Sequence, residues 1–202
     1  MVMPDGHTAA TCVAVYDEPE HRVEVENDHV YAYRVRLAPG QTTLWHRHTE
    51  DTVYFALAAA RGQEELATRA AIVTEIPCGI AVSRPHRSEP LVHKVTNLGD
   101  DLFHMIGAEA HARPAYGVRT PRVPSDREVV LETPRFVVHR LRPGPAVATW
   151  HSTACGLLVA LAPCVLQSAG KTHLDAGALR WVAPFEPLEL PTDFDGFFAQ
   201  WR

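Results

Sequence analysis

The feature that most constrains the fold is a succession of short, strand-like runs broken by turn residues. The segments 30–37 and 51–60 are rich in apolar and aromatic residues, and Pro39-Gly40 closes the first of them. The 202-residue chain has 16 prolines and 12 glycines, which suit frequent turns between strands. Residues 62–70 are the best helix candidate and read as a turn or a short helix. We therefore predict an all-β protein, a barrel or a sandwich.

Charge and composition narrow the classes of partner. The formal net charge is −5 and no block of Lys and Arg occurs, so we expect neither nucleic acid nor an anionic membrane as a partner. Residues 1–20 lack the basic and apolar regions of a secretory signal, and no apolar run approaches the roughly 20 residues that span a bilayer. The four cysteines are scattered without a C-x-x-C pair, which indicates buried thiols. We predict a cytoplasmic protein.

A weak internal repeat divides the chain. Residues 30–48 and residues 135–153 share alternating strand residues, then Leu-x-Pro-Gly, an apolar stretch and Trp-His. Between them, residues 111–126 are rich in Pro and Arg and have no apolar period, as expected of a linker. We therefore predict two similar β units, residues 1–112 and residues 113–202, with chance similarity as the alternative.

Two histidines in the first unit, His46 and His48, indicate a metal site. On a strand the side chains of residues i and i+2 project to the same side, and an imidazole nitrogen is a good ligand for Fe, Zn, Ni, Cu or Mn. His93 lies within another strand-like run and completes a three-ligand face if that strand lies beside the first. Asn97, at the end of this run, is interpreted as a turn residue that satisfies backbone groups.

The spacing of these residues resembles the cupin superfamily, whose members are small β-barrels of the jelly-roll type. The first cupin motif is G-x5-H-x-H-x3,4-E-x6-G, and Gly40, His46 and His48 match its opening. The second motif is G-x5-P-x-G-x2-H-x3-N, of which His93 and Asn97 are present. The three other positions of the second motif are occupied by Val82, Ser88 and Pro90. With the repeat, the resemblance implies an all-β bicupin, that is, two RmlC-like jelly-roll barrels in tandem.

The glutamate of the first motif is missing, because Thr52 or Val53 stands at its place. The resemblance then favours a site of three histidines, as in cupins that resemble thiol and diketone dioxygenases. In a second option Glu50 or Asp51 supplies a carboxylate ligand, although strand parity requires a bulge to turn Asp51 inward. A site without metal is the third option.

The second unit has lost the histidine pattern. His151 matches His46 only approximately, Thr153 stands where His48 would be, and Leu190 falls near the position of His93. We therefore expect a degenerate barrel without a metal site, with a role in packing.

Tyr54 and His104 are the candidate catalytic residues. Parity with His48 directs Tyr54 inward if the strand resumes in phase, where it would contact a substrate or a metal-bound water; the alternative is an aromatic core residue. His104 lies on a strand that a cupin barrel places near the site, and His86 is a further candidate for a group behind the ligands. Arg34 would bind a substrate carboxylate only if its face turned inward, and we expect a solvated face.

These residues favour an enzyme with one metal ion that acts on a small molecule. The cofactor is a divalent transition metal. Fe²⁺ is favoured, with dioxygenase chemistry, because that is what a three-histidine cupin site resembles. Zn²⁺, Ni²⁺ or Mn²⁺ with isomerase or lyase chemistry is one alternative, and a non-catalytic metabolite-binding cupin is another. Because cupins commonly pair through edge strands, we expect a homodimer, with a monomer as the alternative.

Overall fold

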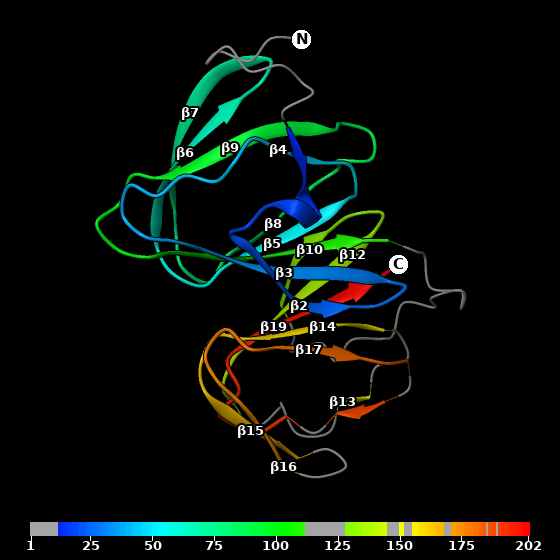
Figure 1. Cartoon of the computed structure of the whole chain (residues 1–202). Coiled ribbons are helices and arrows are strands. Elements are labelled where there is room, and N and C mark those ends of the chain that lie inside the picture. The colour runs from blue at the N-terminus through cyan, green and yellow to red at the C-terminus, as the bar shows by residue number, and fades with distance from the viewer. Residues whose placement is uncertain are drawn as a thin grey trace. The chain divides into compact units, whose positions relative to one another are not determined.

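A computed structural model of the chain describes residues 12–111, 128–144, 150–151, 155–167, 171–184, 186–188 and 190–202. Strands make up nearly all of their regular structure, which confirms the all-β prediction (Figure 1). The described residues fall into two compact units, one within 1–26 and 30–109 and one within 27–29 and 110–202. The predicted linker and the boundary at 112/113 lie, except for His111, outside the described residues, so that boundary stays a prediction.

The first unit consists of two five-stranded sheets, with the strand orders β1-β4-β9-β6-β7 and β2-β3-β10-β5-β8. A single 3-10 turn, η2 (Val15–Asp17), follows β1. The strands are β1 (Val13–Ala14), β2 (His21–Glu26), β3 (Val30–Leu37), β4 (His46–His48), β5 (Thr52–Ala56), β6 (Ala60–Leu66), β7 (Arg69–Ile76), β8 (Ala81–Arg84), β9 (Leu91–Asn97) and β10 (Phe103–Ala110).

The predicted helix candidate at 62–70 is wrong. Residues 62–66 belong to β6, a turn follows, and β7 begins at Arg69. The segment Gln63-Glu64-Glu65-Leu66-Ala67 has good helix propensity, but β6 forms ladders with both β7 and β9. Pairing on both sides satisfies the backbone of the strand, so the tertiary context overrides the local preference.

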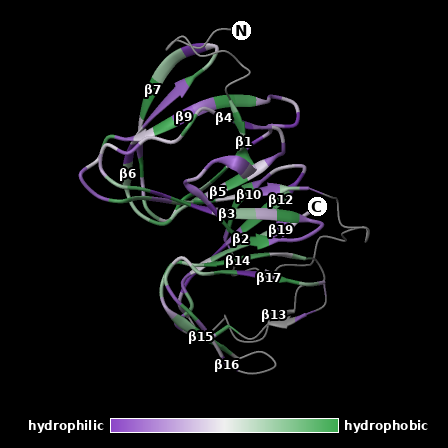
Figure 2. Ribbon diagram, viewed as in Figure 1, coloured by the Kyte–Doolittle hydropathy of each residue, from purple (hydrophilic) through white to green (hydrophobic). Residues whose placement is uncertain are grey.

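An apolar cluster fills part of the space between the two sheets. It contains Tyr33, Val35 and Leu37 of β3, with Phe103 of β10 packed beside them. Hydrophobic residues occur along most of the strands, with hydrophilic residues among them (Figure 2). Gly107 makes room for the ring of Tyr33, because a Cβ at this glycine would lie 2.4 Å from the Tyr33 Cζ. The cluster thus holds Tyr33 across β10.

Asn97 ties together the loops at the end of β9, as predicted. Its side chain is fully buried, and its Nδ2 donates to the carbonyl oxygens of Leu37 and Asp101 at 2.9 and 2.8 Å. Its Oδ1 accepts a hydrogen bond from the Gly99 amide at 2.9 Å. The side chain of Asn97 therefore satisfies backbone groups, as a turn residue does, and its polar atoms are engaged there.

The second unit has one five-stranded sheet, with the order β11-β12-β19-β14-β17, which corresponds to the sheet β2-β3-β10-β5-β8 of the first unit. It also has two further strand pairs, β13-β18 and β15-β16. Its strands are β11 (Glu128–Glu132), β12 (Phe136–Leu141), β13 (Trp150–His151), β14 (Gly156–Ala160), β15 (Cys164–Gln167), β16 (Lys171–Leu174), β17 (Leu179–Val182), β18 (Pro187–Leu188) and β19 (Gly196–Trp201).

The interior of the second unit is apolar. Leu158, Phe194 and Phe198 are fully buried in one cluster, and Leu190, which the sequence aligns with His93, belongs to the same cluster. His151 pairs in register with Pro187, which has no ligand atom. The metal-free character of this unit stays a prediction, and a core filled by leucine and phenylalanine supports it.

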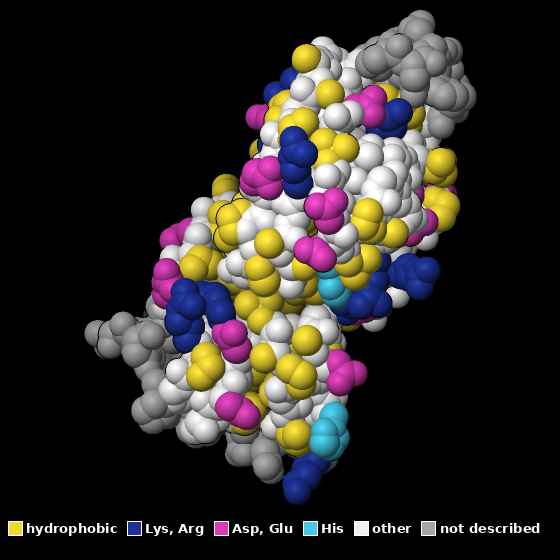
Figure 3. Space-filling model, turned by 90° about the vertical axis from the view of Figure 1, so that its left-hand side faces the viewer, with side chains coloured by type: hydrophobic (Ala, Val, Ile, Leu, Met, Phe, Trp, Pro, Cys, Tyr) yellow, Lys and Arg dark blue, Asp and Glu magenta, His cyan; other side chains and the backbone are white. Residues whose placement is uncertain are grey.

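Figure 3 shows acidic, basic and hydrophobic side chains interspersed on the face that it displays. Among the described residues, no helix has the length and the apolar character that crossing a membrane would require.

Candidate metal centre

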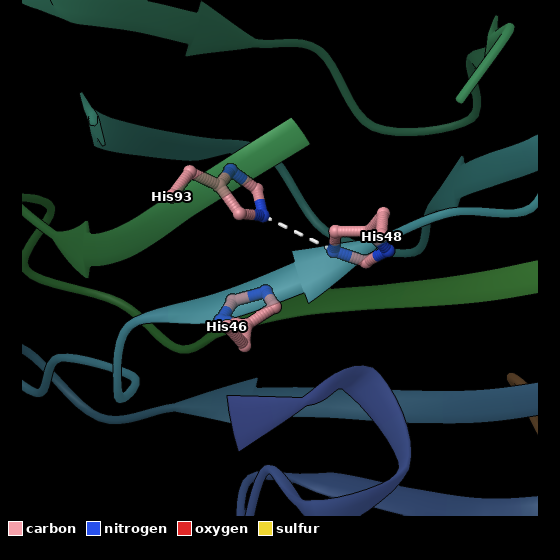
Figure 4. A group of neighbouring side chains, drawn as sticks. All are labelled: His46, His48 and His93. Carbon is pink, nitrogen blue, oxygen red and sulfur yellow. Dashed lines mark hydrogen bonds between the residues drawn. The ribbon is translucent and has the colours of Figure 1, made fainter. Parts of the chain in front are cut away.

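His46, His48 and His93 lie together inside the first unit. His46 and His48 project to the same side of β4, and the register of β4 with β9 places His46 directly opposite His93 (Figure 4). All three side chains are buried, with exposures of 1%, 1% and 7%. The i, i+2 spacing and the pairing of two neighbouring strands are therefore enough to bring the three imidazoles together.

A hydrogen bond fixes the Nδ1 atom of each of the three rings. Nδ1 of His46 donates to the carbonyl oxygen of Leu44 at 2.9 Å. Nδ1 of His48 lies 3.2 Å from Oε1 of Glu109, and Nδ1 of His93 lies 2.7 Å from Oε1 of Glu64. With Nδ1–H donating to these acceptors, the free lone pair of each ring is on Nε2. Partners of this kind set the tautomer and the orientation of metal-binding histidines.

The spacing of the nitrogens fits one metal ion. Nε2 of His48 and Nε2 of His93 are 3.1 Å apart and face one another (Figure 4). Two imidazole nitrogens bound at about 2.0–2.1 Å to a common ion lie roughly 2.9–3.4 Å apart, depending on the angle between them. One ligand atom from each of the three histidines can be chosen so that all lie within 4.8 Å of one another. The donor set, three imidazoles, suits a divalent transition metal.

Burial favours the neutral, metal-binding form of two of the imidazoles, His46 and His48. Desolvation holds the pKa of His46 and of His48 well below the usual range, and the neighbouring His93 lowers both pKa values further. Glu64 has a lowered pKa because it accepts the hydrogen bond from His93, whereas burial raises the pKa of Glu109 to about 7. Carboxyl groups thus lie behind two of the three histidines, Glu109 behind His48 and Glu64 behind His93.

Glu109 occupies a position that explains the missing glutamate. Thr52, at the motif position, is buried, and its hydroxyl donates to the carbonyl oxygen of Glu50 at 2.8 Å. Glu109 lies directly across from Thr52 on the neighbouring strand β10, and its carboxyl group reaches His48 from there. β10 thus places a carboxyl group beside the motif position, where it hydrogen-bonds His48 and is not one of the clustered ligand atoms.

The two acidic residues beside the histidines point elsewhere. Glu50 forms an ion pair with Arg87, with Oε2 and Nε 2.6 Å apart, and Oδ1 of Asp51 accepts a hydrogen bond from the Arg87 amide at 3.1 Å. Neither belongs to the cluster of close ligand atoms found among the described residues. This geometry favours the three-histidine option over the carboxylate-assisted one.

A cavity of about 450 Å³ adjoins the three histidines. Tyr54 lines it, as strand parity predicted, and its hydroxyl lies 3.1 Å from Nε2 of His86. His86 is buried and stacks on His48 with 5.1 Å between ring centroids. His21, which the sequence interpretation missed, also lines the cavity, stacks on Tyr33 and meets the edge of the His46 ring. The wall next to the ligands is therefore aromatic and imidazole-rich.

His104 lies on the opposite face of its sheet. Its neighbours Phe103 and Met105 line the cavity, so the side chain between them points away from it. Its Nε2 lies 2.7 Å from Nη1 of Arg34, which also pairs with Glu24. The catalytic role predicted for His104 receives no support from this placement, and Arg34 lies on the outward face as expected.

Glu64 and Glu109, the hydrogen-bond partners of His93 and His48, were not identified by the sequence interpretation either. Glu109 stands alone among small and apolar residues at 106–110, and a lone carboxylate in a buried strand was the available signal. Its partner, however, is 61 residues away in the sequence. Glu64 lies in the segment that was predicted to be a turn or a short helix. Because a strand was not expected there, the direction of its side chain could not be inferred from strand parity.

No family model matches the chain, and no curated protein sequence does. Solved structures share its fold. Protein Ylba from E. coli has a TM-score of 0.64 at 10% identity, covering 100% of this chain and 89% of that chain. Salicylate 1,2-dioxygenase from Pseudaminobacter salicylatoxidans has a TM-score of 0.58 at 15% identity, covering 86% and 71%. A cupin 2 conserved barrel domain protein from Leptotrichia buccalis has a TM-score of 0.53 at 12% identity, covering 89% and 87%.

At these identities the likeness is one of fold. The chain has the cupin fold, and the resemblance seen in its sequence is confirmed at that level. Within this fold, His46, His48 and His93 form a group that could hold a metal ion.

The carboxyl group of Glu109 should contribute to metal affinity without binding the metal. Replacing Glu109 by Ala removes the acceptor of His48 Nδ1, and we expect metal affinity to fall by about 10–100-fold. Glu109→Gln keeps an acceptor oxygen and should lose less. Competition with a chromogenic chelator measures the affinity.

Glu50→Ala and Asp51→Ala are the matched controls, because both carboxylates engage Arg87. Their metal affinity should equal that of the wild type. A larger loss in either control than in Glu109→Ala would favour the carboxylate-assisted site instead.

Proposed function

We propose that this cupin binds one divalent transition metal through Nε2 of His46, His48 and His93. The observation that carries the proposal is the fixed orientation of the three rings. Each Nδ1 has a hydrogen-bond partner, and two of the Nε2 atoms are 3.1 Å apart, a spacing that suits two ligands of one ion. Fe²⁺ is the favoured ion, and Zn²⁺, Ni²⁺ or Mn²⁺ are alternatives.

We further propose that the protein is an enzyme of the non-heme iron dioxygenase type that acts on a small molecule. The cavity of about 450 Å³ beside the ligands has the size of a small-molecule site. Bound iron would supply redox chemistry with O₂, whereas Zn, Ni or Mn would supply Lewis-acid chemistry for an isomerase or lyase. A neighbour in fold, salicylate 1,2-dioxygenase, has been solved as an adduct with gentisate, and this supports placing the dioxygenase first.

Tyr54 is the residue of the cavity wall that we assign to contact with the substrate. Its hydroxyl donates to Nε2 of His86, whose Nδ1 faces the carbonyl oxygen of Glu89 at 3.4 Å. The phenol ring lines the cavity, where a small molecule would contact it. Burial raises the pKa of Tyr54, so the phenol stays protonated at neutral pH.

Metal analysis tests the first part of the proposal. Protein purified without chelators, or loaded anaerobically with Fe²⁺, should hold about one transition ion per chain by mass spectrometry. His46→Ala and His93→Ala should lose it, because two imidazoles bind a divalent ion too weakly to retain it. His104→Ala is the control and should keep the wild-type content, since its side chain lies on the other face of the sheet. A wild-type chain that holds no metal under either condition contradicts the proposal.

Oxygen consumption tests the second part. The iron-loaded protein should take up O₂ with at least one member of a panel of salicylate, gentisate, thiols and β-dicarbonyls, as measured with an oxygen electrode. Uptake should vanish in His93→Ala and fall about tenfold in Tyr54→Phe, which loses one hydrogen bond to substrate. Absence of uptake across the panel would leave the isomerase, the lyase or the metabolite-binding module.

A homodimer and a cytoplasmic location stay predictions. Strand β7 is the edge of its sheet within the described chain, and it exposes Ile72 and Val73. An exposed apolar edge is a surface on which a second copy could add its own strand. Light scattering of the purified protein should give twice the mass of one chain. Val73→Lys should lower the measured mass to that of one chain. A wild-type protein that is already a monomer would contradict the predicted homodimer.

A further inference from the structure

The cavity beside the histidines is largely apolar and has one arginine in its wall. Hydrophobic residues from both sheets line it, among them Val35, Ile76, Val82, Leu91, Phe103 and Met105. The arginine is Arg84, the last residue of β8, which is exposed at the edge of its sheet. The three histidines therefore lie inside the cavity, and a positively charged side chain lies at its edge.

Strand register places Arg84 on the inner face. Arg84 lies directly opposite Thr52, and Val82 lies opposite Tyr54. Val82 and Tyr54 both line the cavity, and residues two apart share a face, so Arg84 projects to the same side. On the far side of Thr52 the next residue in this row is Glu109, which holds His48. Two strand spacings, roughly 10 Å, separate the backbone of Arg84 from that of Glu109.

The guanidinium of Arg84 has no partner in the part of the chain that the structure describes. Within the described residues, Arg84 forms no hydrogen bond or ion pair, whereas the two carboxylates of the cavity wall each have a partner. Glu64 accepts a hydrogen bond from His93, and Glu75 pairs with Arg61. Arg84 also lines a second, smaller hollow of about 240 Å³ that adjoins the first. Glu64 and Leu91 line both hollows together with Arg84.

We propose that Arg84 binds the carboxylate of a small organic acid whose apolar remainder lies in the cavity and reaches toward the three histidines. A guanidinium matches a carboxylate with two parallel hydrogen bonds, which fixes the direction of the ligand as well as its charge. A single arginine beside an apolar wall suits a monocarboxylate better than a phosphate ester. That this acid is the substrate rests on the proposed function; the anion site itself does not.

Calorimetric titration of acids against their neutral amides tests the proposal. The full chain, as purified and with its metal content determined, is titrated with acetate and acetamide, benzoate and benzamide, and hexanoate and hexanamide. At least one acid should bind about tenfold more tightly than its amide, as expected for one charge-assisted contact near the surface. Arg84→Ala should remove most of this preference, and Arg84→Lys should keep a part of it.

Arg87→Ala is the matched control, since Arg87 is an exposed arginine nearby that pairs with Glu50. It should keep the full preference for the acid. If no acid binds better than its amide, or if Arg84→Ala keeps the preference, the carboxylate is not held by Arg84 and the proposal fails. All variants should hold as much metal as the wild type, so a failure of metal binding is seen separately from a failure of anion binding.

Discussion

The hydrogen bonds to the three Nδ1 atoms are the interactions on which the site depends. A buried imidazole is neutral and has one donor and one acceptor nitrogen, so the partner of one nitrogen decides what the other can do. Oxygen atoms of Leu44, Glu64 and Glu109 accept from the Nδ1–H groups of His46, His93 and His48. The Nε2 atoms are thereby left to face the cavity, and the rings of His21 and His86 pack against His46 and His48.

The histidines could be predicted from the sequence because their relation is local and periodic. His46 and His48 share a face by the two-residue repeat of a strand, and His93 needs only one neighbouring strand. Glu109 could not be predicted in the same way, because its contact with His48 depends on the order of strands in a different sheet. The sequence also could not predict which face of its sheet His104 occupies. Apolar residues lie on both sides of that strand, so the pattern does not distinguish the inner face from the outer one.

The two units show how one strand scaffold accommodates either a site or a core. In the first unit, Thr52 and Tyr54 of β5 face Glu109 and Gly107 of β10. In the second unit, Gly156 and Leu158 of β14 face Gln200 and Phe198 of β19 in the same relation. Gly107 makes room for the ring of Tyr33, and Tyr54 lines the cavity, whereas Leu158 and Phe198 belong to a packed apolar cluster. The ladder is kept, and the volumes of a few inward side chains decide between a cavity and a packed interior.

Strand β1 gives the beginning of the described chain an influence on the site. It runs parallel to β4, with Val13 beside His46, and its first amide donates to the carbonyl oxygen of Trp45. Two residues later, Val15 is buried in the apolar cluster, and its carbonyl oxygen accepts from Nδ1 of His21. The strand β4, which carries His46 and His48, is therefore paired with β9 on one side and with the two-residue strand β1 on the other. If the chain were shortened for expression, a start after residue 14 would remove β1 and leave that edge of β4 unpaired.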